Sequence, residues 1–184
     1  NEYRINNNED REIFGFDIAQ VFRDEIKENL PSKSTLGNNS SEIVGKVEIN
    51  PLDSINVSYD FSLDNNLDRS NYDYLQANFN VNNFVTSFKF LEEKNIIGNE
   101  GFAEAKITYN FQNNNSLSFA TRENKKTNIT EFYNLIYQYR NDCLEAAIEY
   151  NKDYYADANT EPEEQLFFSI SIKPFGSAST KGAN

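Results

Sequence analysis

The chain has 184 residues, of which 38 % are hydrophobic and 14 % aromatic, and a formal net charge of −12 at pH 7. This content is sufficient for a folded domain and excludes a chain that is disordered throughout. The negative charge and the scarcity of basic clusters argue against binding the phosphate backbone of nucleic acid.

Side chains of alternating polarity recur along the chain and predict β-strands. From Ile55 to Leu63 every second residue is apolar, and the residues between them are Asn, Ser and Asp. Successive side chains of a strand point to opposite faces, so this pattern predicts strands with one apolar and one polar face. The first expected strand begins at Glu12, and the polar stretch from Asp24 to Ser40 predicts a long loop. In chain order the expected strands are 12–23, 41–50, 55–63, 71–82, 84–92, 100–111, 116–123, 131–140, 142–155 and 164–173.

The connections between these strands alternate in length. Short turns rich in Asn, Asp or Pro, which hairpins require, lie at 50–54, 82–83, 112–115 and 141–142. Longer connections lie at 24–40, 64–70, 93–99, 124–130 and 156–163. Outer-membrane barrels have short periplasmic turns and longer outer loops. The alternation therefore predicts an all-β fold, an antiparallel up-and-down transmembrane β-barrel whose first expected strand runs outward.

Charged residues favour one parity of the expected strands. In the middle of each strand after the first, the apolar parity holds no charge, as in Leu144, Ala146 and Ile148. A charged side chain on the lipid face costs roughly 2–4 kcal/mol at the bilayer midplane, so this parity is expected to face lipid. The opposite parity carries Lys46, Glu48, Asp60, Lys89, Glu104, Lys106, Arg122, Arg140, Glu145, Glu149 and Lys173.

Two other interpretations stay open at this point. A soluble antiparallel protein that packs its apolar face on a core shows the same alternation, so a soluble all-β ligand-binding module is one alternative. A complete small outer-membrane pore is the other. Long strands and tyrosines near strand ends, such as Tyr72, Tyr139 and Tyr154, favour a membrane barrel with interfacial girdles.

The sequence does not predict an enzyme, a cofactor or a metal site. Histidine is absent, which removes the usual metal ligand and the base of any Ser-His or Cys-His arrangement within this chain. Pairs of carboxylates such as Glu92 with Glu93 are expected by chance in a chain with 29 acidic residues. The single cysteine, Cys143, is either a free thiol or bonded to a partner outside the chain.

Particular residues resemble a known family. The segment Tyr137 to Glu145, which includes Asn141-Asp142-Cys143, is similar to the penultimate hairpin of the lipopolysaccharide-assembly outer-membrane protein family (LptD/OstA). Phe167 to Gly176 resembles that family's last strand and its exit, and Leu30 to Gly45 resembles an entry into its C-terminal strands. The resemblance implies that residues 1–176 are the C-terminal portion of a larger barrel and that 177–184 form a polar tail.

The resemblance also implies a function in the cell outer membrane. A member of this family transports lipopolysaccharide and inserts it into the outer leaflet through a lateral gate. The implied partners are lipopolysaccharide, a plugging outer-membrane lipoprotein (LptE-like) and a periplasmic bridge protein (LptA-like). Cys143 would form a disulfide with the family's N-terminal region. The lateral-gate strand would run from Glu164 to Lys173, with Leu166, Phe168, Ile170, Ile172 and Pro174 as its site residues.

Overall fold

The computed structural model describes every residue except 9, 27–34, 95–98, 155–160, 174–175 and 183–184. The described residues form twelve β-strands and one short 3₁₀ turn, η1 (Thr35–Gly37). Within the same residues, no helix is long and apolar enough to cross a membrane. The strands are β1 (Glu2–Asn6), β2 (Glu12–Ala19), β3 (Ile43–Leu52), β4 (Ile55–Leu63), β5 (Ser70–Val81), β6 (Phe84–Glu93), β7 (Gly101–Asn110), β8 (Asn115–Asn124), β9 (Ile129–Arg140), β10 (Leu144–Asp153), β11 (Glu163–Ile172) and β12 (Gly176–Gly182).

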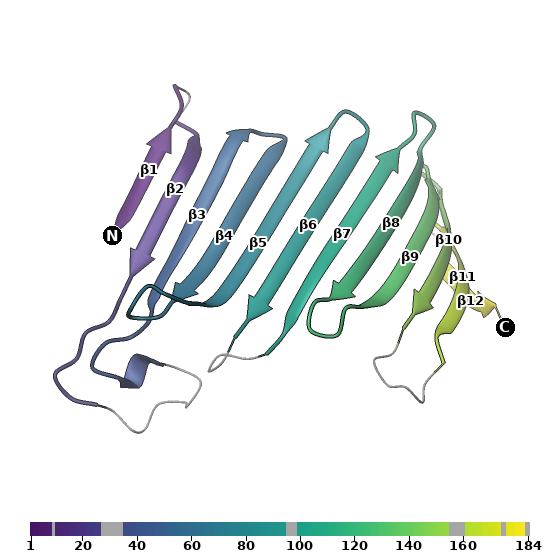
Figure 1. Cartoon of the computed structure of the whole chain (residues 1–184). Coiled ribbons are helices and arrows are strands. Elements are labelled where there is room, and N and C mark those ends of the chain that lie inside the picture. The colour runs from purple at the N-terminus through teal and green to yellow at the C-terminus, as the bar shows by residue number, and fades with distance from the viewer. Residues whose placement is uncertain (9, 27–34, 95–98, 155–160, 174–175, 183–184) are drawn as a thin grey trace. The chain divides into compact units, whose positions relative to one another are not determined.

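The strands follow one another in space as they do in the sequence. Each is hydrogen-bonded to its chain neighbours, in the order β1 to β12 (Figure 1). The pairs β1–β2, β2–β3, β3–β4, β8–β9, β9–β10, β10–β11 and β11–β12 are antiparallel. The prediction of an all-β, antiparallel, up-and-down arrangement is therefore confirmed.

The chain forms two compact units. The first comprises Asn1–Asn78 and Phe88–Phe102, and it contains β1 to β4 and most of β5. The second comprises Phe79–Ser87 and Ala103–Asn184, and it contains β8 to β12 and most of β7.

Each expected strand overlaps one of β2 to β11, and β4 has the predicted bounds. Two further strands, β1 and β12, are not predicted by alternation. β1 has only Tyr3 and Ile5 as alternating large apolar residues, and β12 (GSASTKG) has none. β12 covers most of the segment expected to be a polar tail, because its backbone pairs with β11 from Leu166–Gly182 to Ile172–Gly176. Backbone hydrogen bonds do not require the alternation on which the prediction depends.

β2 ends at Ala19, four residues earlier than expected. The Gln20 amide nitrogen donates to Ser40 Oγ at 2.9 Å, to the Ser41 carbonyl at 3.0 Å and to Asn65 Oδ1 at 3.0 Å. These bonds join the end of β2 to the connection that precedes β3 and to the β4–β5 connection. The continuous ladder with β3 stops there, and only an isolated bridge between Phe22 and Ser40 follows.

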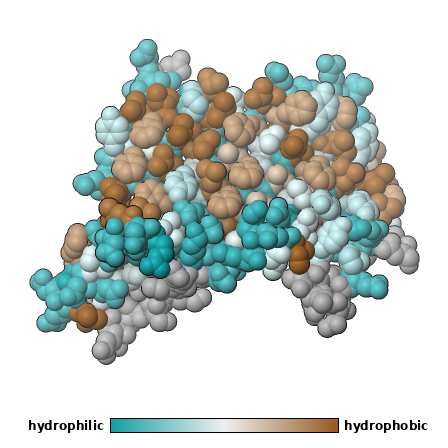
Figure 2. All heavy atoms as spheres, viewed as in Figure 1, coloured by the Kyte–Doolittle hydropathy of each residue, from teal (hydrophilic) through white to brown (hydrophobic). Residues whose placement is uncertain are grey.

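The strand register gives the first unit two chemically different faces. Phe16, Val47 and Tyr59 lie opposite one another on β2, β3 and β4, and the next residues along form the row Asp17, Lys46 and Asp60. Directly opposed residues project to the same side of a sheet. We call the side of the first row the uncharged face and the side of the second row the polar face. The side of the first unit that Figure 2 presents is mostly apolar between the strand ends.

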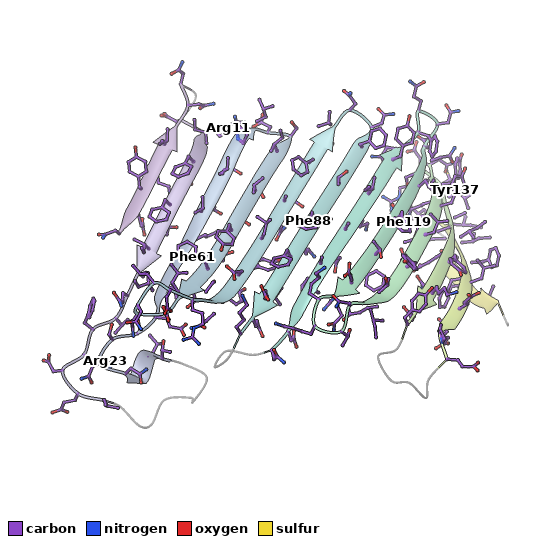
Figure 3. The ribbon with its side chains drawn as sticks, viewed as in Figure 1. Arg11, Arg23, Phe61, Phe88, Phe119 and Tyr137 are labelled. Carbon is purple, nitrogen blue, oxygen red and sulfur yellow. The ribbon has the colours of Figure 1, made fainter. Side chains whose placement is uncertain are left out.

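The apolar side chains do not form a core. Within the described residues, the only buried hydrophobic side chains are Ala77 and Leu91. Large hydrophobic residues of the apolar parity are exposed instead, because no second layer covers them. A soluble sandwich would bury such residues, so their exposure favours a face that meets lipid. They include Ile49, Phe79, Leu117, Phe119, Leu135, Tyr137, Ile148, Phe168, Ile170 and Ile172 (Figure 3 labels Phe119 and Tyr137).

Side chains connect neighbouring hairpins at both ends of the first unit. At the short-turn end, the Arg11 guanidinium forms an ion pair with Asp53 and donates to the Pro51 carbonyl at 3.0 Å. At the long-connection end, Asn65 bonds to Gln20 and Ser40. We call these two sets of contacts the end clasps. Figure 3 shows Arg11 at the short-turn end and Arg23 at the opposite end.

Gly45 lies on the uncharged face under an aromatic ring. Its partner across β3 and β4 is Phe61, and a Cβ at position 45 would lie 2.7 Å from Cε1 and 2.8 Å from Cε2 of the Phe61 ring. The Phe61 ring stacks on Tyr59 with centroids 5.6 Å apart. A cross-strand aromatic ring that covers a glycine compensates for the packing that glycine lacks.

We therefore predict that Gly45→Ala destabilises the protein by about 1–3 kcal/mol, the range for overpacking. In a Phe61→Leu background the added methyl no longer meets the ring, so Gly45→Ala is expected to be neutral or stabilising. Thermal unfolding in detergent, followed by gel mobility, measures both costs. An equal cost in the two backgrounds would contradict a specific contact between Gly45 and Phe61.

Candidate functional site

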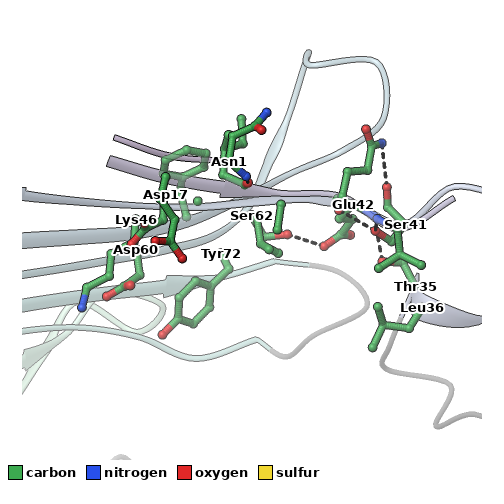
Figure 4. Close-up of a pocket in the computed structure, with 18 residues that line it drawn as sticks. Asn1, Asp17, Thr35, Leu36, Ser41, Glu42, Lys46, Asp60, Ser62 and Tyr72 are labelled. Carbon is green, nitrogen blue, oxygen red and sulfur yellow. Dashed lines mark hydrogen bonds between the residues drawn. The ribbon is translucent and has the colours of Figure 1, made fainter. Parts of the chain in front are cut away.

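A groove of about 770 Å³ lies on the polar face of the first unit. Its floor comes from β2, β3 and β4, and η1 and the start of β5 border it (Figure 4). The lining residues are Asn1, Glu2, Asp17, Ile18, Ala19, Gln20, Val21, Thr35, Leu36, Ser41, Glu42, Val44, Gly45, Lys46, Asp60, Phe61, Ser62 and Tyr72.

A row of charged side chains crosses the groove. Glu2, Asp17, Lys46 and Asp60 are directly opposite one another on β1 to β4, so their side chains share the polar face. The single cation of this row lies between two carboxylates, and its Nζ is 2.7 Å from Glu48 Oε1. The row is net negative, which suits neutral or hydroxyl-rich ligands better than anionic ones.

Arg4 fixes one end of this row. Its Nη1 is 2.6 Å from Asp17 Oδ1 and its Nη2 is 2.7 Å from Asp17 Oδ2, a bidentate geometry. Its Nε lies 3.4 Å from Glu12 Oε2. Gly15 lies opposite Arg4, and a Cβ there would fall on the Glu12 carboxylate and lie 3.4 Å from Arg4 Cδ. The absent side chain at Gly15 leaves room for the Arg4 ion pairs.

Asp60 and Tyr72 contribute uncommitted polar groups to the groove. Within the described residues, neither the Asp60 carboxylate nor the Tyr72 hydroxyl forms a hydrogen bond, although both side chains are half-buried. The Asp60 carboxylate accepts and the Tyr72 hydroxyl donates and accepts, so together they can bind hydroxyl groups. Ser62 and Thr35 are already committed to the Glu42 contacts.

The most buried polar cluster of the described chain borders the groove. The Glu42 side chain accepts from Ser62 Oγ at 2.5 Å, and the Glu42 backbone N–H donates to Thr35 Oγ1 at 3.0 Å (Figure 4). The Glu42 carboxylate also accepts from Asn71 Nδ2 at 2.7 Å. Glu42 is 7 % exposed and Ser62 4 %. Burying a carboxylate requires such partners, and both its oxygens have one. We call this cluster the Glu42 node; it joins η1, β3, β4 and β5.

Two acidic residues interact in the β4–β5 connection outside the strands. The Asp68 backbone N–H donates to Asp64 Oδ1 at 3.1 Å. A side-chain hydrogen bond from Asp68 lowers the pKa of Asp64, and the same bond with charge repulsion raises the pKa of Asp68. No group of three or more Cys, Asp or Glu side chains in the described part of the chain is arranged to hold a metal ion.

The structure places Cys143 in the turn between β9 and β10. Its side chain is exposed, and its backbone N–H donates to Asn141 Oδ1 at 2.9 Å. The same oxygen accepts from Leu144 N at 2.7 Å, and the Lys173 backbone N–H donates to the Cys143 carbonyl at 2.9 Å. The turn is thus held by hydrogen bonds and presents the thiol to the outside.

The residues expected to form a lateral-gate strand lie on β11. Leu166, Phe168, Ile170 and Ile172 alternate on one face, and the last three are exposed. Pro174 lies outside the described residues. β11 pairs with β10 on one side and with β12 on the other, so a further strand follows the expected gate strand.

Sequence reasoning did not identify the groove. Lys46 and Asp60 were on the expected polar parity, but Glu42 was not singled out. Its partners Ser62 and Asn71 come from different strands, and only the register brings them together. A usable signal is the change from the Ser- and Asn-rich loop to alternation at Ser41-Glu42.

The Glu42 node gives a testable prediction. Glu42→Ala leaves Ser62 and Asn71 without their acceptor, and a hydrogen bond to a charged group contributes about 1.5–3 kcal/mol. We expect a lower unfolding temperature in detergent and faster tryptic cleavage after Arg23, because the connection loses its attachment. Glu42→Gln retains an acceptor for Asn71 and a polar partner for Ser62, and is the matched control. Equal effects of the two variants would contradict the proposed role of these bonds.

Comparison with known proteins identifies the family. No curated protein matches the chain. The model of one family, LPS transport system D (LptD), matches residues 1–100, which is more than half of the chain and includes every residue that lines the groove. The match ends before the Cys143 hairpin, although the sequence of that hairpin also resembles the family. The apolar exposed face and the antiparallel order of strands agree with an outer-membrane protein. The chain belongs to the LPS transport system D family of the outer membrane.

Proposed function

We propose that this chain forms part of the wall of an outer-membrane barrel that inserts lipopolysaccharide into the outer leaflet through a lateral opening. The observation that carries the proposal is the contrast between its faces. The charged residues of the first unit's ladders lie on the side of the groove, whereas the opposite side is uncharged along β2 to β4 and exposes Tyr3, Ile5 and Ile49. Such a wall separates lipid from a polar interior.

The two faces suit the two parts of the transported molecule. Acyl chains are compatible with the uncharged face, and the sugar portion with a polar interior. The groove supplies Asp60 and Tyr72, whose uncommitted groups can bind sugar hydroxyls. A plugging lipoprotein inside the barrel and a periplasmic bridge protein that delivers the lipid complete the proposed pathway. No bond is made or broken in this function.

We place the lateral opening at β12. The expected gate strand β11 pairs with β10 on one side and with β12 on the other. The sequence of β12, GSASTKG, contains Gly at both ends and no large apolar residue. Gly weakens a strand because it adds backbone entropy and no side-chain packing. These features support separation at this strand more than at β10 or β11.

A disulfide lock tests the opening. Ser179→Cys on β12 is combined with cysteines on the strand that faces β12 in the complete protein, in cells depleted of the unaltered protein. We expect oxidation to reduce lipopolysaccharide at the cell surface, measured with an antibody on intact cells, and reduction to restore it.

The matched control locks a pair that is not expected to separate. Ala147 and Ser169 are directly opposed on β10 and β11, so Ala147→Cys with Ser169→Cys should crosslink without affecting surface lipopolysaccharide. If the β12 crosslink forms fully and transport continues, the opening lies elsewhere. If depletion of the protein itself leaves surface lipopolysaccharide unchanged, the transport function is wrong.

We also propose that Cys143 forms a disulfide with a cysteine outside this chain. Its exposure and the hydrogen-bonded turn around it support an accessible partner site. In the complete protein, Cys143→Ser is expected to change mobility on a non-reducing gel to that of the reduced form. Quantitative maleimide labelling of Cys143 without prior reduction would contradict the bond.

A further inference from the structure

The chain just after β2 forms a short, fixed ribbon. The Ser41 N–H donates to the Val21 carbonyl at 2.8 Å, and the Arg23 N–H donates to the Asn39 carbonyl at 2.8 Å. Phe22 and Ser40 form the bridge between these bonds. We call residues 21–23 with 39–41 the outer ribbon. Its hydrogen bonds hold the backbone of Phe22 in place.

Two further contacts anchor the outer ribbon to the sheet. Asn65 in the β4–β5 connection donates to the Ser40 carbonyl at 3.1 Å and accepts from Gln20 at 3.0 Å. Ser41 precedes Glu42, whose carboxylate is bonded to β4 and β5. Side-chain contacts, as well as the hydrogen bonds of the outer ribbon, therefore fix the backbone of Phe22 within the first unit.

Phe22 is nevertheless exposed. Its exposed fraction is 73 %, the highest among the large hydrophobic residues of the described chain, and Ile26 follows with 67 %. An exposed apolar side chain on a fixed backbone loses no backbone entropy when a partner covers it. This arrangement suits a binding surface better than a solvated loop.

The alternation of β2 assigns the side on which Phe22 lies. Val21 has the parity of Asp17 and Ala19 and lines the groove with them; Ile18 and Gln20 of the other parity also border it. Phe22 continues the other parity, which contains Phe16 and Ile18 of the uncharged face and then Gln20, whose amide donates to Ser40, the bridge partner of Phe22. Phe22 therefore extends the uncharged face beyond the end of β2, at the long-connection end of the first unit.

We propose that Phe22 inserts into the outer leaflet at the level of the lipid headgroups and anchors the outer ribbon to the membrane surface. Continuity with the lipid-facing surface identifies the occupant as lipid. The long connections of outer-membrane barrels lie on the outer side, which assigns the leaflet. The inference requires a membrane-facing sheet but not the lateral opening of the proposed function.

Tryptophan substitution with a matched neighbour tests this anchor, since the chain itself contains no Trp. Phe22→Trp and Val21→Trp are introduced separately into the complete protein and reconstituted in phosphatidylcholine vesicles. Some vesicles contain lipid brominated near the headgroup end of its acyl chains. We expect the fluorescence of the tryptophan introduced at position 22 to be quenched in the vesicles that contain brominated lipid. The emission added at position 21 should persist there and be quenched by iodide in water.

Three results would overturn the proposal. Equal quenching of the two positions by brominated lipid would show that the side chains at positions 21 and 22 do not face different surroundings. Quenching of position 22 by iodide alone would place Phe22 in water. Protection of position 22 from both quenchers would mean that a protein surface covers it. Surface lipopolysaccharide in cells carrying the same variants reports separately on transport.

A second measurement does not depend on the tryptophan probe. Phe22→Ser is expected to lower the unfolding temperature more in lipid vesicles than in a lipid-free complex with an amphipathic polymer. The reason is that the substitution removes a contact with lipid. Val21→Ser, which changes a groove residue, should lower both by the same amount. Equal temperature shifts for the two variants in vesicles would contradict the anchor.

Discussion

Lipid hydrocarbon offers no hydrogen-bond partner, and this constraint determines the strand pairing on which the rest of the structure depends. Every backbone N–H and C=O in a lipid-facing segment must bond within the protein, and strands achieve this only by pairing with neighbours. Pairing fixes the register, and the register fixes which residues share a face. The separation of Phe16, Val47 and Tyr59 from Asp17, Lys46 and Asp60 is a consequence of that pairing. The groove and the charged row exist only because the same ladders hold their residues together.

The chain also differs from soluble proteins in which kind of side chain it buries. Its described residues bury hardly any large apolar side chain, and its most buried polar residues are Ser41, Glu42, Ser62 and Asn71. The buried cluster is therefore polar, and it lies where a long connection meets three strands. A carboxylate in such a place is stabilised by hydrogen bonds with defined geometry. It attaches a loop to one position on the sheet more specifically than apolar packing would.

The strands were largely predictable because alternation and the length of connections are local properties of the sequence. β4 was predicted with its observed bounds. β12 could not be predicted in this way, because its Gly, Ser and Thr residues carry no apolar alternation and its pairing is a backbone property. The end of β2 depends on bonds from Gln20 to residues about twenty and forty-five positions away, which local patterns do not report.

The groove was beyond sequence reasoning for the same physical reason. Glu42, Ser62 and Asn71 are separated along the chain, and their contact depends on the register of β3, β4 and β5. The polar parity indicated which face of the sheet would carry charged residues. It did not indicate where a groove would lie on that face. The family was anticipated from the Cys143 hairpin, from Phe167 to Gly176 and from Leu30 to Gly45, and the family model matches residues 1–100, which include only the last of these segments. The N-terminal strands thus carry the family's pattern more clearly than short motifs suggested.

The end clasps have a consequence for the accuracy of assembly. Sliding one hairpin past the next by one residue moves the strands by about 3.3 Å and transfers every side chain to the opposite face. Such a slip would separate Arg11 from Asp53 at one end and Asn65 from Gln20 at the other. It would also present Lys46 to lipid. A slipped register therefore loses the contacts at both ends of the hairpins. The end clasps destabilise misaligned strands even in the absence of a membrane.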